Sequence, residues 1–280
     1  MTTGSDPRLT PARGDLAAAH LKGKVESAAF AEPRKAQAVR AVVGLFRQPD
    51  EPSGQQTQIL FGETFDVYEE KNGWAWGQCG LDGYVGFARA KAFAPPEAPT
   101  HRVQALSTPL FVAPDVKHGA RQILPLNAKV SLADPAGRFV ALANGQFVFA
   151  RHLARLDAVI SDWVSVAERF VGVPYVWGGK TWAGIDCSGL VQTALETGGV
   201  AAPRDSDMME SGLGIELSRD APLKRGDLIF WKGHVGIMLD AARLIHANGF
   251  HMQVSIEPLA LVDERTKERE SLPIRTIRRL

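Results

Sequence analysis

The stretch Asp186-Cys187-Ser188-Gly189-Leu190 decides how the second half of this chain folds. Apolar residues follow it at helical spacing and Gly198-Gly199 ends the run, so we expect a helix that begins at or near Cys187. The dipole of a helix favours a thiolate at its N-terminus and lowers the pKa of a cysteine placed there. The sequence therefore predicts a reactive thiol at the start of this helix.

Two histidines lie downstream in segments with the alternating pattern of strands, Gly233-His234-Val235-Gly236 and Leu244-Ile245-His246. A hairpin at residues 240–243 would make the two strands neighbours in an antiparallel sheet. The alternation leaves His234 on the face opposite Val235, where we expect the cysteine helix to approach. His234 could then take the thiol proton, while His246 fixes the tautomer and orientation of His234.

The same three residues allow less specific interpretations. A cysteine at a helix start is often only a buried structural residue, and one cysteine with two histidines could bind zinc. No fourth ligand at metal-like spacing is evident, and a zinc-bound thiolate would be a poor acyl acceptor. We therefore expect no metal and no cofactor, and we interpret Cys187 as a nucleophile. Asp186 can equally be a simple helix cap or a group that contacts a ligand.

An internal repeat precedes this segment. Three landmarks recur in the same order at nearly constant spacing: Leu45-Phe46 as Leu110-Phe111, Gln58-Ile59-Leu60 as Gln122-Ile123-Leu124, and Phe87-Ala88-Arg89 as Phe149-Ala150-Arg151. Each copy contains short alternating segments and turn residues, as in small all-β barrels. We expect a lead-in at 1–40, barrels at 41–92 and 101–155, and a catalytic domain at 156–280.

The composition excludes several classes of partner. The chain has 32 Lys and Arg against 31 Asp and Glu, so its formal net charge of +1 gives no reason to expect nucleic acid or an anionic membrane. No apolar stretch resembles a secretory leader or a membrane span, which makes the cytoplasm the expected location. In that compartment we expect both cysteines to be reduced thiols.

These motifs resemble the NlpC-type cell-wall cysteine peptidases, a papain-like family with Tyr-x-Trp-Gly-Gly, Asp-Cys-Ser-Gly, Gly-His-Val-Gly and a final histidine strand in this order. The resemblance covers about residues 161–280. The first upstream copy resembles a bacterial SH3-like domain, and the second a degenerate version of it. The implied fold is α+β, with a papain-like catalytic domain, its cysteine helix packed on an antiparallel sheet, after two small SH3-like β-barrels.

The resemblance also implies roles for individual residues. Cys187 would be the nucleophile, His234 the base and His246 the orienting third residue, with the Cys187 amide as an oxyanion donor. The Asp186 carboxylate would pair with a free α-ammonium group of the substrate. The implied substrate-binding residues are Tyr175, Asp186, Ser188, Glu63 and Tyr84.

Family members with this architecture include γ-D-glutamyl-L-diamino acid endopeptidases. We therefore expect a cysteine peptidase that hydrolyses the γ-D-Glu to diamino acid bond of murein stem peptides with a free N-terminal L-Ala, in cell-wall peptide recycling. Its partners would be peptidoglycan-derived peptides. Two alternatives stay open, a peptidoglycan-binding protein and a Cys-His amidase or acyltransferase, because the triad specifies acyl transfer while the pocket selects the bond.

Overall fold

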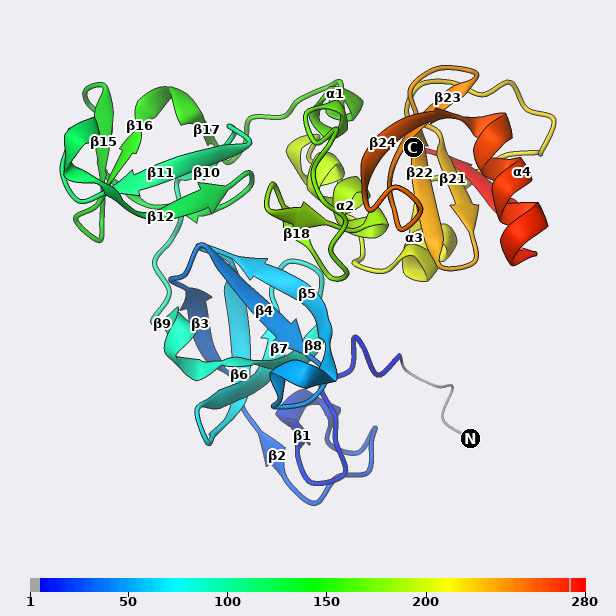
Figure 1. Cartoon of the computed structure of the whole chain (residues 1–280). Coiled ribbons are helices and arrows are strands. Elements are labelled where there is room, and N and C mark those ends of the chain that lie inside the picture. Colours follow the sequence, from blue (N-terminus) through cyan, green and yellow to red (C-terminus); the bar gives the residue numbers. More distant parts are fainter. Residues whose placement is uncertain (1–5, 272) are drawn as a thin grey trace. The chain divides into compact units, whose positions relative to one another are not determined.

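The computed structural model describes residues 6–271 and 273–280, and the chain divides after Leu156 into two compact units. The first unit is built from short β-strands, whereas the second combines helices with a six-stranded sheet (Figure 1). Among the described residues, no helix has the length and apolar character needed to span a bilayer.

The first barrel is a seven-stranded antiparallel sheet with the order β5-β4-β8-β7-β6-β3-β9. Its strands are β3 (Arg34–Ala38), β4 (Val42–Phe46), β5 (Gln55–Leu60), β6 (Thr64–Lys71), β7 (Trp74–Cys79), β8 (Val85–Arg89) and β9 (Phe93–Ala94). Asn72 and Gly73 both have positive φ, as the predicted hairpin turn requires. β3 pairs with β6, so the barrel includes a strand that precedes the expected boundary at residue 41.

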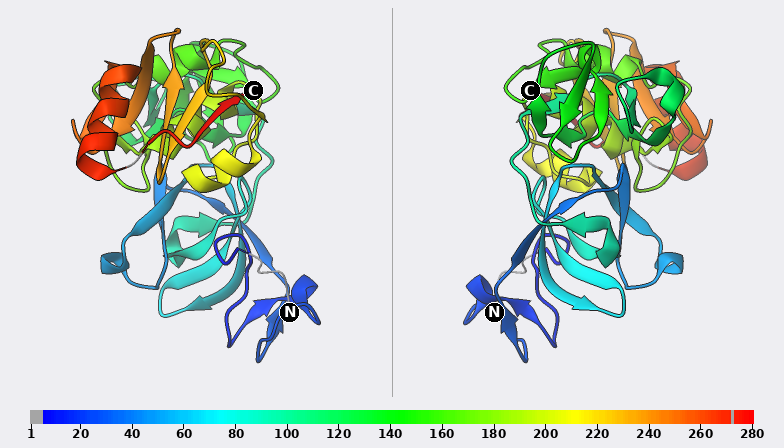
Figure 2. Two further views of the ribbon diagram at one scale, coloured as in Figure 1. Left: turned by 90° about the vertical axis from the view of Figure 1, so that its right-hand side faces the viewer. Right: turned by 90° about the vertical axis from the view of Figure 1, so that its left-hand side faces the viewer.

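The lead-in contains two very short strands, β1 (Ala17–Ala18) and β2 (Phe30–Ala31), which pair in parallel. It is the dark blue segment in both views of Figure 2. Ala18 packs in one cluster with Tyr68 and Trp76 of the first barrel. The 3₁₀ turns of the first unit are η1 (Ala19–Leu21), η2 (Glu51–Ser53), η3 (Ala90–Ala92), η4 (Val116–His118) and η5 (Ala150–His152).

The second copy forms two small sheets, ordered β13-β10-β17 and β12-β11-β16-β15-β14. Its strands are β10 (His101–Val103), β11 (Ser107–Phe111), β12 (Ala120–Pro125), β13 (Lys129–Val130), β14 (Leu132–Asp134), β15 (Phe139–Leu142), β16 (Phe147–Phe149) and β17 (Leu153–Arg155). β11 and β12 repeat the bulged pairing of β4 and β5. Likewise Phe111 pairs with Phe147 as Phe46 pairs with Phe87. The two copies therefore share their strand pairing, but of the three sequence landmarks only Leu45-Phe46 keeps its register. Gln122 corresponds to Thr57 and not to Gln58, and Phe147, not Phe149, corresponds to Phe87.

The second unit contains a six-stranded antiparallel sheet with the order β20-β25-β21-β22-β23-β24. These strands are β20 (Ile215–Glu216), β21 (Leu228–Trp231), β22 (His234–Met238), β23 (Arg243–Asn248), β24 (Gln253–Pro258) and β25 (Thr276–Arg279). The remaining elements are α1 (Trp163–Glu168), β18 (Lys180–Thr181), β19 (Gly184–Ile185), α2 (Cys187–Thr197), α3 (Ser206–Gly212) and α4 (Leu259–Glu270). The helix predicted to start at Cys187 is confirmed.

The two faces of this sheet are covered differently from our expectation. Met238 and Leu244 pack with Val262 of α4, and a side chain at Gly236 would meet Leu244 and the Cβ atom of His246. α4 therefore covers the face on which His246 lies, where we expected the cysteine helix, and that expectation was wrong. Figure 1 shows α2 and α4 on opposite sides of the sheet.

Candidate active site

Cys187 is the first residue of α2 and is buried. Main-chain amides of Val235 and Ser188 hydrogen-bond to its sulfur, which places the thiol beside the first residues of β22. Burial, together with the nearby Asp186 charge, raises the pKa of this thiol to about 12, against the smaller lowering by the two amides and Arg204. The expected low thiol pKa is therefore wrong for the ligand-free protein, because desolvation outweighs the helix end.

Asp186 is the N-cap of α2 and has no free lone pair. Its carboxylate accepts from the amides of Gly189 and Gly178, each at 2.7 Å, and from both terminal nitrogens of Arg204 at 3.0 and 2.7 Å. Arg204 also donates to the Ser188 hydroxyl at 2.8 Å. Asp186 and Ser188 thus brace the cysteine helix, and a substrate ammonium would have to share an occupied oxygen. Their role as substrate contacts stays a prediction.

The glycines before and after Cys187 allow close main-chain packing. A Cβ at Gly189 would lie 2.2 Å from the carbonyl oxygen of Gly179, and one at Gly179 would lie 2.5 Å from that of Gly184. No side chain fits at such distances. These glycines therefore let the loop before α2 lie against the helix start.

Tyr175 lies in this loop, which hydrogen-bonds to the strand region ahead of β24 through the Tyr175 amide and the Met252 carbonyl at 2.9 Å. Burial raises the pKa of the phenol above its ordinary range, and the charges of Cys187 and Asp186 add to the shift. The phenol is therefore a neutral hydrogen-bonding group close to the thiol. That position agrees with the expected role in shaping the site, which stays a prediction.

The two histidines meet as the sequence predicted. Nε2 of His234 lies 2.8 Å from Nδ1 of His246, and the ring centroids are 5.1 Å apart. Burial lowers the pKa of both imidazoles, so both are neutral near pH 7. No hydrogen bond joins the sulfur of Cys187 to either ring, all three residues being in the described part. The resting site is thus a neutral thiol beside a neutral histidine pair.

Glu257 completes this line of polar groups, and the sequence analysis missed it. Its Oε2 lies 2.7 Å from Nε2 of His246, and Arg265 donates to both oxygens at 2.7 and 3.0 Å. His251 lies 3.2 Å from Oε1. Burial would raise the pKa of Glu257, but the hydrogen bonds from His246, Arg265 and His251 hold it below its ordinary range. The alternation of β24, next to the strand of His246, was the available signal.

A pocket of about 420 Å³ opens on the histidine side of the site. Its lining includes both rings of the pair together with Lys232, Phe250 and Arg265, but not Cys187. Within the described residues no cluster of three or more His, Cys, Asp or Glu side chains has a geometry suited to a metal ion. Both cysteines are free thiols.

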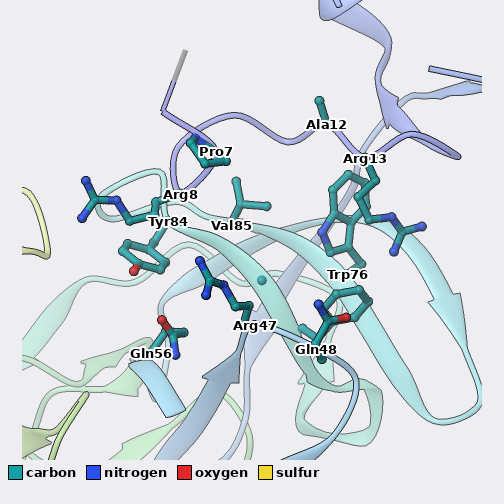
Figure 3. Close-up of a pocket in the computed structure, with 12 residues that line it drawn as sticks. Pro7, Arg8, Ala12, Arg13, Arg47, Gln48, Gln56, Trp76, Tyr84 and Val85 are labelled. Carbon is teal, nitrogen blue, oxygen red and sulfur yellow. The ribbon is translucent and has the colours of Figure 1, made fainter. Parts of the chain in front are cut away.

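The two substrate residues expected from the first barrel have different surroundings. Glu63 is buried, and its carboxylate accepts from the Leu60 amide at 2.9 Å. Tyr84 lines a pocket of about 260 Å³ with Arg13 and Arg47, and Glu63 is absent from that lining (Figure 3). The proposed contact of Glu63 and Tyr84 with substrate stays a prediction.

The site geometry agrees with comparisons to known proteins. The NlpC/P60 family model matches residues 172–267, which include the cysteine and both histidines. The chain carries an NlpC/P60 domain. It is a cysteine peptidase, and a second model, the bacterial dipeptidyl-peptidase SH3 domain, matches residues 45–93 in the first barrel.

Two curated relatives are similar to more than two thirds of this chain. It is 27% identical over 254 residues to a γ-D-glutamyl-L-lysine dipeptidyl-peptidase of Bacillus cereus, covering 78% of this chain and 75% of that protein. The protein of the same name from Bacillus subtilis is 28% identical, over 69% and 72% of the two chains. A solved NlpC/P60 family structure from Bacillus cereus has the same fold, with a TM-score of 0.73 at 22% identity over 88% of this chain and 99% of that one.

Proposed function

We propose that this peptidase hydrolyses the γ-D-Glu to diamino acid bond of murein stem peptides that carry a free N-terminal L-Ala. The observation that carries the proposal is the line of Cys187, His234 and His246 in a chain similar, over most of its length, to γ-D-glutamyl-L-lysine dipeptidyl-peptidases. Released wall peptides in the cytoplasm would be its substrates, in a recycling role.

In the proposed reaction, His234 takes the thiol proton as the Cys187 sulfur attacks the carbonyl carbon of the γ-D-Glu residue. The main-chain amide of Cys187, at the start of α2, donates to the developing oxyanion. Collapse of the tetrahedral intermediate breaks the C–N bond, and the His234 imidazolium gives its proton to the leaving amine. Water then attacks the thioester with His234 as base, which releases the dipeptide acid and restores the thiol.

Because the Cys187 thiol and both imidazoles are neutral in the free protein, activation of the thiol depends on the bound substrate. A buried thiol with a raised pKa does not ionise by itself, so the proton moves only when the carbonyl is in place to receive the sulfur. Substrate binding also displaces water and aligns the thiol, His234 and the carbonyl. Both effects favour the proton transfer from the thiol that burial disfavours in the free protein.

Recognition of the peptide amine is proposed for the side of the site near Asp186. Tyr175 has the Asp186 carboxylate and the Arg204 guanidinium among its electrostatic neighbours, so an ammonium placed beside the phenol would meet the negative charge of Asp186 and compete with Arg204 for it. Ser188, Glu63 and Tyr84 would complete this subsite. Because Asp186 is already bonded to Arg204, an ammonium there would loosen part of that pair.

We also propose that the second copy, residues 101–155, is a degenerate SH3-like domain that acts as a scaffold. Its strand pairing repeats that of the first barrel, whereas Phe139 and Ala141 stand where the first barrel has Trp74 and Trp76.

The test is hydrolysis of L-Ala-γ-D-Glu-meso-diaminopimelate and of its N-acetylated form. We expect cleavage of the free-amine tripeptide only, with release of L-Ala-γ-D-Glu, and loss of turnover in Cys187→Ala. Equal cleavage of both peptides would refute the amine requirement. Unchanged turnover in the variant would remove the nucleophile assignment, and faster attack on intact sacculi than on tripeptide would exclude a recycling role.

A further inference from the structure

Glu257 is connected to the histidine pair by a hydrogen bond that leaves no choice of donor. An ionised carboxylate only accepts, so at 2.7 Å the shared proton must be on Nε2 of His246. Glu257 is ionised because its hydrogen bonds to His246, Arg265 and His251 hold its pKa low. The tautomer of His246 is therefore set by its neighbour on β24.

The tautomer of His246 in turn determines the tautomer of His234. A neutral imidazole with its proton on Nε2 can only accept at Nδ1, so the 2.8 Å contact requires His234 to donate from its own Nε2. His234 then has an unprotonated Nδ1. That nitrogen is the one nearer the main chain, where the next amide, that of Val235, hydrogen-bonds to the sulfur of Cys187.

We propose that Glu257, held by Arg265, is a positioning residue that places the unprotonated nitrogen of His234 toward the thiol by fixing the tautomers of both histidines. This inference rests on the proposed roles of Cys187 and His234. Glu257 itself stays ionised throughout and takes no proton. When His234 becomes an imidazolium during the reaction, the carboxylate also stabilises that charge through His246.

Arg265 makes Glu257 difficult to replace. It donates to both carboxylate oxygens, and His251 and Ser255 also approach them, at 3.2 and 3.5 Å. A glutamine here has a single acceptor oxygen, which the guanidinium attracts. Its NH₂ group would then face His246, which would have to accept at Nε2 and carry its proton on Nδ1. The same reversal would follow at His234, whose Nδ1 would become protonated.

The first variant is therefore Glu257→Gln, compared with Glu264→Gln, which removes the same charge from an exposed position on α4. We expect Glu257→Gln to lower kcat by about 10- to 100-fold, as loss of a carboxylate partner does for other functional histidines, with a smaller change in KM. The acid limb of its pH–rate profile, where His234 becomes protonated and can no longer act as base, should move to lower pH, because the imidazolium has lost its counter-charge. Glu264→Gln should match the parent protein in both respects.

The second measurement is the ¹⁵N NMR spectrum of the histidine rings, which reports tautomers without any need for turnover. In the parent protein we expect His234 and His246 both to carry their proton on Nε2, and in Glu257→Gln both on Nδ1. Glu257→Asp, which keeps the charge on a shorter side chain, should keep the parent tautomers and recover part of the rate. It also serves if Glu257→Gln does not fold.

The outcomes separate this inference from the proposed function. Parent-like kinetics and parent-like ring spectra in Glu257→Gln would overturn the positioning role and leave the peptidase proposal intact. If Cys187→Ala kept full turnover, the catalytic roles would fail, while the ring spectra would still report whether Glu257 sets the tautomers. A rate loss in Glu257→Gln with unchanged tautomers would also overturn the inference, since the effect would then be structural.

Discussion

Asp186 is a buried carboxylate and Glu257 a partly buried one, and an arginine binds each of them through both oxygens, yet their remaining contacts differ. Asp186 accepts from main-chain amides, so it fixes the start of α2. Glu257 accepts from His246, so it fixes where a proton lies. The arginine ion pair is common to both carboxylates and does not determine their roles. The second partner does: main-chain amides make Asp186 a structural group, whereas His246 makes Glu257 part of the active site.

Burial also separates the two ion pairs. The side chains of Arg204 and Asp186 are 1% and 9% exposed, whereas those of Arg265 and Glu257 are 16% and 12% exposed. A charge left without its partner costs more where water cannot reach it. The first pair should therefore matter more for folding, and the second more for the rate.

The largest expected effect is that of Arg204→Met, which leaves the Asp186 carboxylate buried without its counter-charge. We expect the free energy of unfolding to fall by about 3–5 kcal/mol, measured by urea denaturation. The matched control is Arg225→Met, which breaks a more exposed pairing with Asp162 and Glu168 and should cost less than about 1 kcal/mol. Equal losses in the two variants would show that burial does not distinguish these pairs.

A smaller effect is expected for Arg265→Met. Glu257 keeps its hydrogen bond to His246 and some contact with water, so the unfolding free energy should fall by roughly 1.5 kcal/mol. The same urea titration measures it. A loss as large as that of Arg204→Met would contradict the difference between the two ion pairs, because both would then stabilise the fold to the same extent.

The smallest effect is a dependence of stability on pH. Burial lowers the pKa of His246 below its ordinary 6.5, so below that pH the unfolded chain binds a proton that the folded one does not, and stability falls. The lowered pKa of Glu257 adds a second loss below its ordinary 4.5. In Glu257→Gln the second loss should vanish, so the variant should lose less stability than the parent protein as the pH falls below about 5.5.

Urea titrations at about pH 7, 5.5 and 4 check this prediction. If the parent protein and Glu257→Gln lose the same stability between the two lower values, the hydrogen bonds to Glu257 do not hold its carboxylate ionised.

The sequence predicted those parts of the site that depend on local patterns. Cys187 starts a helix because a capping residue precedes it and an apolar face follows, and His234 and His246 meet because a short hairpin joins alternating strands. The turn at Asn72-Gly73 was predictable for the same reason, since positive φ values select those residue types.

The parts that the sequence could not give depend on contacts between distant segments. The thiol pKa follows from burial, which exists only after α2 packs on β22 and β23. The sequence left open whether Asp186 caps the helix or contacts a ligand, because its hydrogen bond from Arg204 joins segments that are apart in the sequence. Glu257 had no motif of its own, because its role comes from lying diagonally across β23 and β24 from His246.

The position of β25 has a consequence for the newly made chain. β25 lies between β20 and β21, and Arg279 binds Asp227 through two 2.7 Å contacts. Until β25 takes its place, β22 to β24 can already bring His234, His246 and Glu257 together, but β21 has an open edge that could pair with another chain. The catalytic groups can thus assemble before the sheet that carries them is protected against misassembly.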